Sequence, residues 1–214
     1  MSNETSTIVL GQPGVGKSFF MKAKLNSTLC GNENASVYLC GEPNEYQQIM
    51  DSYSGKEIDR KSLLDDSAPR FCVLNSKKLC EFDLEDILKS LQEKPLEEGK
   101  EVYLFIDDAD SFIRSKSLAD KILKLPKNNI SAFLTATNVL SSFSDFVFDC
   151  DSAIILLKDQ SDFSTYSKVL GFNKHQFETE YDQTNLSVKD GTLFALIREK
   201  RNEDFISKTY HFEL

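Results

Sequence analysis

A lysine and a serine close a glycine-rich stretch near the start of the chain, which reads GQPGVGKS. The spacing of Gly11, Gly16 and Lys17–Ser18 fits the pattern G-x-x-x-x-G-K-[ST] without a gap. Glycines let successive backbone N–H groups point at one anion, and the lysine adds a compact positive charge. The serine hydroxyl suits Mg²⁺, so the stretch predicts a loop that holds the phosphates of ATP. The predicted ATP-binding residues are Gly11, Pro13, Gly14, Val15, Gly16, Lys17, Ser18 and Phe19.

Two carboxylates follow a run of five apolar residues in the stretch VYLFIDDAD. A carboxylate that ends a buried strand lies at the ligand edge of a parallel sheet. We therefore expect Asp107 to hold Mg²⁺ together with Ser18, and Asp108 to polarise the attacking water. The alternative interpretation is an acidic loop in which Asp110 caps the next helix.

A third polar strand end lies in the stretch AFLTATN, which closes on Thr137 and Asn138. Asn138 would sense the γ-phosphate if this strand lies between the strand of the phosphate loop and the strand of the acidic pair. A strand that simply ends in a polar turn is the alternative. The predicted catalytic residues are Lys17, Asp108 and Asn138.

The elements that must position these residues alternate between apolar runs and helical patterns, which is typical of a parallel sheet with crossover helices. Strands are expected at residues 7–10, 36–40, 70–75, 102–106, 131–137 and 153–158. Helices are expected at residues 17–28, 44–55, 82–94 and 117–125, the third with Asp83 as its N-cap. Residues 56–66 remain unassigned, residues 159–182 read as polar and mostly helical, and two strands around a charged turn end the chain.

These elements predict an α/β fold, and together with the phosphate-loop and acidic-pair motifs they resemble a P-loop NTPase of the RecA-like (ASCE) type. We expect one domain over residues 1–214, with a parallel sheet flanked by helices and a C-terminal β-hairpin.

Composition excludes several function classes. The 34 acidic and 25 basic residues give a net charge of −9, so any DNA binding does not use a strongly basic monomer surface. Five widely spaced cysteines and two histidines disfavour a disulfide framework and a zinc site, and they suit a reducing cytoplasm. The sequence shows neither an apolar run long enough to cross a bilayer nor a signal peptide. We expect a cytoplasmic protein, which could dock on a membrane complex.

Four stretches together resemble the ATPase domains of conjugative-transfer (type IV secretion) proteins in the FtsK/HerA superfamily: GQPGVGKSFFMKAKL, GEPNEYQQIMDSYSG, VYLFIDDAD and TATN. The second is similar to the family's D-P-x-x-E-Y stretch, with Glu42 and Pro43 in place of Asp and Pro, and it is one residue shorter. The end of the chain from AIILLK onward is also similar to the family's ending, so the resemblance covers residues from about Ser6 to the C-terminus.

The resemblance implies a motor-type ATPase that forms a homo-oligomer, such as a hexameric ring, and hydrolyses ATP with Mg²⁺ between subunits. Its partners would be other proteins of the transfer apparatus, and its cargo DNA, protein or pilus components. Several positions depart from the family's pattern. The usual Asp-Glu pair is Asp107–Asp108, the usual sensor Gln is Asn138, and only Lys127 remains of the basic residues before the sensor strand. Arg198 and Arg201 are the candidates for an arginine finger, and the family's N-terminal domain and longer helical insertion are missing or shortened.

Two other functions stay open. A degenerate, non-hydrolysing nucleotide-binding subunit with a regulatory role would suit the missing Glu and the scarcity of arginine. An AAA+ ATPase of the replication-initiator or helicase-loader kind would suit the Asp-Asp pair and LTATN, although such proteins normally end in a helical lid. A kinase is disfavoured because an arginine-rich lid is absent, and a GTPase because no N-K-x-D motif is present.

Overall fold

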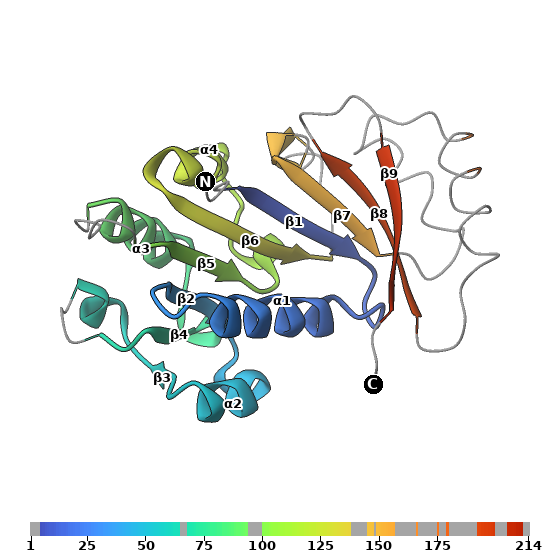
Figure 1. The fold of residues 1–214 in the computed structure, drawn as a ribbon. Helices are drawn as coiled ribbons and strands as arrows, with labels where there is room; N and C mark the ends of the chain where they lie inside the picture. Colours follow the sequence, from blue (N-terminus) through green and yellow to red (C-terminus); the bar gives the residue numbers. More distant parts are fainter. Residues whose placement is uncertain are drawn as a thin grey trace.

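The computed structural model describes residues 5–64, 68–93, 100–137, 145–147 and 149–156, the single residues 166, 175 and 179, and the strands 192–199 and 205–211. The described residues form one sheet of nine strands in the order β3-β4-β2-β5-β6-β1-β7-β8-β9 (Figure 1). The strands in chain order are β1 (Ser6–Gly11), β2 (Ser36–Gly41), β3 (Lys56–Glu57), β4 (Phe71–Asn75), β5 (Val102–Ile106), β6 (Ile130–Ala136), β7 (Ser152–Leu156), β8 (Thr192–Glu199) and β9 (Phe205–His211).

The seven strands from β3 to β7 in the sheet order pair in parallel. Their carboxyl ends therefore share one edge of the sheet, which is where α/β proteins place their ligands. β6 lies between β1 and β5, as the sensor-strand hypothesis requires. β8 and β9 extend the sheet beyond β7 with antiparallel pairing.

Helices cover both faces of the parallel strands, and the sequence pattern explains why (Figure 1). The helices are α1 (Lys17–Gly31), α2 (Pro43–Ser52), α3 (Glu81–Glu93) and α4 (Lys116–Leu123). On β1, Val9 packs in the core shared with α1 and α2, whereas Ile8 and Leu10 pack in the core shared with α3 and α4. Because both faces of the strands are buried, the strands read as continuous apolar runs rather than as alternating ones.

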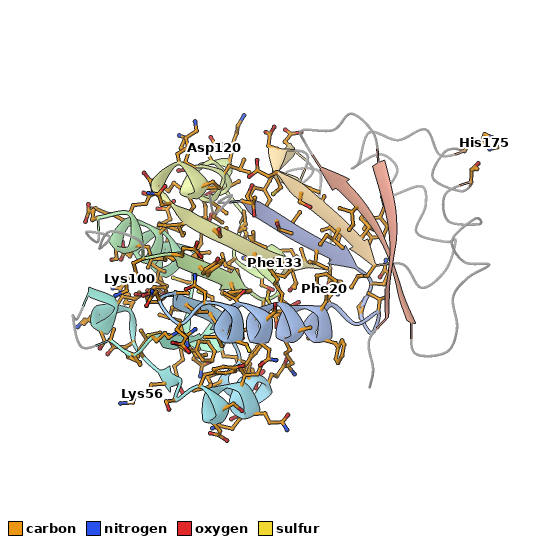
Figure 2. The ribbon with its side chains drawn as sticks, in the orientation of Figure 1. Phe20, Lys56, Lys100, Asp120, Phe133 and His175 are labelled. Carbon is orange, nitrogen blue, oxygen red and sulfur yellow. The ribbon has the colours of Figure 1, made fainter. Side chains whose placement is uncertain are left out.

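An aromatic contact holds α1, the helix that follows the phosphate loop, against the sheet. The rings of Phe20 on α1 and Phe133 on β6 stack with centroids 6.1 Å apart (Figure 2). Phe105 on β5 meets Phe133 at a tilted 5.7 Å. The start of α1 is thereby positioned relative to the two strands whose ends carry the other candidate residues.

Most of the expected elements are present, and their boundaries differ for local reasons. The second helix ends at Ser52 rather than at Gly55, because Ser54 turns left-handed at φ 55° and the Gly55 N–H closes on the Met50 carbonyl at 2.8 Å. Residues 56–64 contain the short strand β3 and the 3-10 turn η1 (Arg60–Leu64). Within the described part of the chain, no helix is both long and apolar enough to cross a membrane.

The predicted position of Asp83 as N-cap is wrong, and so is the alternative in which Asp110 caps the next helix. Asp83 is the third residue of α3, and its carboxylate reaches back to accept the N–H of Cys80 at 2.9 Å, which is the second half of a capping box. Asp110 does not cap α4. Ser115 does, since its hydroxyl accepts the Leu118 N–H at 3.2 Å.

Candidate functional site

The glycine-rich loop joins β1 to α1 at the carboxyl edge of the sheet. Gly14 and Gly16 adopt φ of 81° and 97°, a left-handed conformation that suits glycine. Gly11 is required for space instead, since a Cβ there would lie 2.5 Å from a Val15 methyl and 2.8 Å from the Leu156 carbonyl oxygen of β7. The loop backbone thus depends on glycine at each predicted glycine position, for two different reasons.

Lys17 lies folded against its own loop. Its side chain is 8% exposed, and Nζ donates to the carbonyl oxygens of Gly11 at 2.7 Å and Gln12 at 3.2 Å. Burial lowers the pKa of Lys17, while the nearby carboxylates of Asp108, Asp110 and Asp107 act in the opposite direction. The ammonium group is therefore held at the loop and within the field of the acidic residues. Ser18 and Phe19 follow it with exposed side chains, Phe19 at 38%.

Asp107 is a buried carboxylate with a hydroxyl donor on each oxygen. Thr135 Oγ1 on β6 donates to Oδ1 at 2.5 Å, and Tyr46 Oη on α2 donates to Oδ2 at 2.5 Å. The Asp107 N–H donates to the Cys40 carbonyl at 2.9 Å, which extends the sheet ladder by one residue past β5. These bonds fix the orientation of the carboxylate at the ends of three elements.

Asp108 has a different environment from its neighbour. Its side chain is exposed, its φ is 51°, and its N–H donates to Thr135 Oγ1 at 3.0 Å. Partial desolvation raises the pKa of Asp108, and the charges of Asp107 and Asp110 add to the rise, with Lys17 opposing it. A solvent-facing carboxylate with a raised pKa is suited to accept a proton.

The loop after β5 and the end of β6 are tied together. Asp110 lies in the 3-10 turn η3 (Ala109–Ser111), and its Oδ1 accepts the Thr137 N–H at 3.2 Å. The structure therefore brings Lys17, Asp107 and Asp108 to one edge together with the last residues of β6. Asn138, the predicted sensor, lies just outside the described residues.

The candidate residues for action on a neighbouring subunit lie elsewhere. Lys127 is exposed in the 3-10 turn η4 (Leu125–Asn128), which precedes β6 and so lies at the amino edge of the sheet. Arg198 lies on β8, in register with Ala153 of β7. Arg201 is outside the described residues.

Tyr46 and Thr135 are site residues that the sequence analysis did not single out. Both belong to stretches that carry the family resemblance, GEPNEY and TATN, but neither type of residue suggests a metal site by itself. Both side chains are 0% exposed. Buried hydroxyls need partners, and a hydroxyl within an apolar strand is the signal that could have pointed to Thr135.

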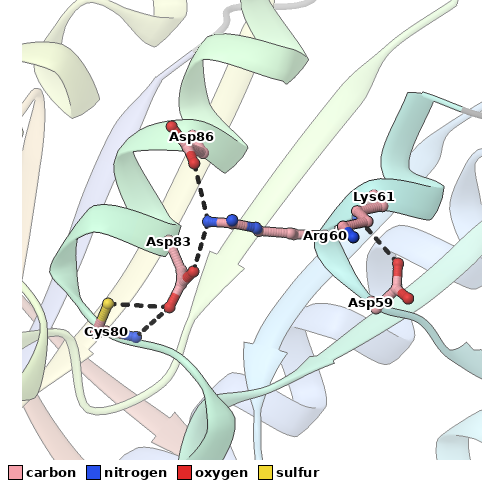
Figure 3. A network of polar contacts seen from close by, with 6 residues as sticks. All are labelled: Asp59, Arg60, Lys61, Cys80, Asp83 and Asp86. Carbon is pink, nitrogen blue, oxygen red and sulfur yellow. Dashed lines mark hydrogen bonds and ion pairs between the residues drawn. The ribbon is translucent and has the colours of Figure 1, made fainter.

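A second polar cluster lies between η1 and the start of α3 (Figure 3). Arg60 of η1 pairs with Asp83 at 2.7 Å and Asp86 at 2.9 Å on α3. The cluster borders an open depression of about 650 Å³, and none of its lining residues belongs to the phosphate loop. Because the charged side chains here pair with one another, we interpret the cluster as a structural link between η1 and α3.

Comparison with known proteins gives a match of fold. No protein-family model and no curated protein matches the sequence. The genome packaging NTPase B204 from Sulfolobus turreted icosahedral virus 2, in complex with AMPPCP, matches with a TM-score of 0.73 and 14% identity over 100% of both chains. VirB4 of Thermoanaerobacter pseudethanolicus matches with a TM-score of 0.69 and 12% identity over 98% of this chain and 89% of that chain.

A KaiC-like protein from Pyrococcus horikoshii OT3 is also similar, with a TM-score of 0.55 and 14% identity over 98% of this chain and 85% of that chain. This chain has the P-loop ATPase fold. The predicted α/β class with a helix-flanked parallel sheet is thereby confirmed. B204 itself has been solved in complex with AMP, with ATPγS and with sulfate.

Proposed function

We propose that this protein binds ATP with Mg²⁺ and hydrolyses it as one subunit of an oligomeric motor that moves DNA. The strand order β5-β6-β1 carries the proposal, since it brings the phosphate loop, the acidic pair and the end of β6 to one edge. Hydrolysis of a γ-phosphate needs these three parts: a cradle, a group that holds the metal, and a group that positions water.

The loop residues supply the cradle. Binding of ATP exchanges the two bonds of Lys17 to loop carbonyls for bonds to phosphate oxygens, so the lysine reaches the ligand by a change of side-chain conformation. The backbone N–H groups of the loop from Gly14 to Ser18 can point at the phosphates, and the start of α1 adds the positive end of a helix dipole. Phe19, exposed beside the loop, offers its ring to the nucleotide.

The residues present fit Mg²⁺, which prefers hydroxyl and carboxylate oxygens and takes its other ligands from phosphates and water. Ser18 contributes an exposed hydroxyl, and Asp107 a carboxylate whose orientation two hydroxyl donors fix. When bound, Mg²⁺ neutralises phosphate charge in the transition state. Asp108 then positions and polarises the attacking water, with Asn138 as the proposed sensor of the γ-phosphate.

DNA is the cargo that the similarity to a genome packaging NTPase favours, because that match spans the whole of both chains. The sequence blocks of the conjugative-transfer family favour a second candidate, a motor of a transfer apparatus with apparatus proteins as partners. A net charge of −9 disfavours tight DNA binding by a monomer in both cases, so we place the DNA contact in a homo-oligomer, such as a ring.

The helicase-loader alternative loses support from the described C-terminal residues. They form β8 and β9, which continue the sheet, in the place where that class carries a helical lid. The non-hydrolysing alternative differs from our proposal only in turnover, so a rate measurement separates the two.

Phosphate release from Mg-ATP, measured against protein concentration, tests the proposal. We expect the rate per subunit to climb with concentration, and to fall about 100-fold or more in Lys17→Ala and in Asp108→Asn. Lys17→Ala should also lose ATP binding, whereas Asp108→Asn should keep it. ATP binding without turnover at any concentration would instead make the protein a nucleotide-gated subunit, and added duplex DNA that leaves the rate unchanged would argue against a DNA motor.

A further inference from the structure

Tyr46 is a buried tyrosine on α2 whose hydroxyl reaches the acidic end of β5. Its side chain is 0% exposed, and Oη donates to Asp107 Oδ2 at 2.5 Å, across 61 residues of sequence. A hydrogen bond to an ionised group is shorter and about twice as strong as one between neutral groups. The bond therefore links α2 directly to the carboxylate that we place beside the metal.

The ring of Tyr46 is held from several sides. Gly41 ends β2, and a Cβ there would come 3.0 Å from Tyr46 Cε2, so glycine leaves the room that the ring occupies. The ammonium group of Lys22, on α1, lies 5.4 Å from the ring centroid. A ring enclosed in this way presents its hydroxyl in one direction.

The protons at this site are also assigned by the contacts. Thr135 Oγ1 accepts the N–H of Asp108 and donates its own proton to Asp107 Oδ1. Tyr46 Oη donates to the other oxygen, Oδ2, so each oxygen of the Asp107 carboxylate accepts one hydroxyl proton.

We propose that Tyr46 is a positioning residue for Mg²⁺ binding, an inference that rests on the proposed function. Its hydroxyl fixes one oxygen of Asp107, so that the remaining lone pairs of the carboxylate face the metal and its waters. Partners of this kind, which bind a ligand group rather than the metal, typically change metal affinity 10–100-fold when they are removed. Because Tyr46 is fully buried, we assign it no contact with the nucleotide and expect its effect to pass through Asp107.

The test separates metal binding from nucleotide binding. A fluorescent ATP analogue is titrated first in EDTA and then with increasing Mg²⁺, for the wild type, Tyr46→Phe and Tyr53→Phe. Tyr53 is a matched control because it lies at the end of α2 and donates its hydroxyl to Asn26 at 2.8 Å, away from the acidic pair. We expect Tyr46→Phe to keep the affinity in EDTA within about twofold and to raise the half-saturating Mg²⁺ concentration about tenfold. Tyr53→Phe should match the wild type in both.

A folded Tyr46→Phe protein with the wild-type Mg²⁺ midpoint overturns the inference, whatever its melting temperature. So does a wild type that binds the analogue equally well with and without Mg²⁺. A wild type that does not bind the analogue at all overturns the proposed function instead. If Tyr46→Phe does not fold, Gly41→Ala provides the test, because its methyl group displaces the ring without removing the hydroxyl. It should raise the midpoint about two- to threefold, and an unchanged midpoint overturns the inference.

Discussion

Asp108 shows how backbone conformation and chemistry meet at one residue. Its φ of 51° is left-handed, and Asp and Asn are the non-glycine residues that tolerate this region best, because their short side chains make local hydrogen bonds. The ATPase family that the sequence resembles has Glu at this position. The left-handed backbone suits the aspartate found here better than it would suit a longer side chain.

Asp108→Asn should make the protein slightly more stable at pH values above the carboxyl pKa, even though the proposed function predicts that it lowers turnover. The pKa of Asp108 is higher in the folded protein than in the unfolded chain, so on raising the pH the carboxyl group ionises first in the unfolded chain. The wild type therefore loses stability as pH rises from about 4 through the folded pKa. Asn keeps the left-handed backbone and does not ionise. We expect a gain of about 0.5 kcal/mol at pH 7, small because the side chain is exposed.

Urea unfolding at pH 7 and at pH 4 measures that difference. The advantage of Asp108→Asn should shrink at the lower pH, where the aspartate is about half protonated in the unfolded chain and more fully protonated in the folded protein. A variant that is less stable than the wild type at pH 7 would mean that attraction to Lys17 outweighs the desolvation and repulsion at Asp108.

The candidate residues that could be predicted from the sequence are those whose roles depend on their immediate neighbours in the chain. Gly11, Lys17 and Ser18 lie in one loop, and Asp107 directly follows an apolar run, so spacing alone pointed to them. Tyr46 and Thr135 act through contacts with Asp107 over 61 and 28 residues of sequence. Such contacts depend on which strands become neighbours, and a single sequence does not state strand order.

At the scale of elements, two polar interactions of Asp83 stabilise the start of α3. The Asp83 carboxylate accepts the Cys80 N–H at the helix start, and it also pairs with Arg60 of η1 (Figure 3). The sequence analysis expected Asp83 to be the N-cap and placed the helix start one residue late. Helix ends are difficult to predict because the residue types that suit the cap and the first turn overlap.

Asp83→Ala should destabilise the protein by about 1–2 kcal/mol, and Arg60→Ala by less than about 1 kcal/mol. Loss of Asp83 removes a capping bond, a favourable charge in the first helical turn and an ion pair, whereas loss of Arg60 removes two exposed ion pairs. Chemical denaturation of both variants gives the two free energies.

The contribution of Asp83 to the free energy of unfolding changes with pH in the opposite direction to the contribution of Asp108. Hydrogen bonds from Cys80, together with Arg60, lower the pKa of Asp83. Its stabilisation is therefore present at neutral pH and is lost as pH falls below about 4 towards the folded pKa. An Arg60→Ala variant as unstable as Asp83→Ala would show that the ion pair, not the cap, is the main contribution.

At the scale of the whole molecule, the parallel sheet places Lys127 and the phosphate loop at opposite edges. β6 has seven residues, so the two lie roughly 20 Å apart along the strand direction. Lys127 is therefore badly placed to reach its own subunit's nucleotide, and a ring is the arrangement in which it would reach a neighbour's.

Mixing two inactive variants tests this arrangement. Lys17→Ala lacks the lysine of its own phosphate loop, and Lys127→Ala lacks the candidate residue that would act on the nucleotide of the neighbouring subunit. Each variant alone should therefore lose at least about tenfold in turnover. In an equimolar mixture, half of the subunits keep Lys17 and the other half keep Lys127, so one site in four combines both residues from two neighbouring subunits. Activity should then recover to roughly a quarter of the wild type. A mixture as inactive as its components would exclude Lys127 and direct the same experiment to Arg198 and Arg201.

The pairing of β1 also bears on how the protein is made. Residues 6–11 leave the ribosome well before their partners in the sheet, residues 130–136 and 152–156. The strand that leads into the phosphate loop therefore lacks both neighbours until more than 100 further residues have been translated, and pairing over such distances in sequence is slow. During synthesis the loop has no fixed frame, so a nucleotide that binds this loop would stabilise the finished fold and not its early intermediates.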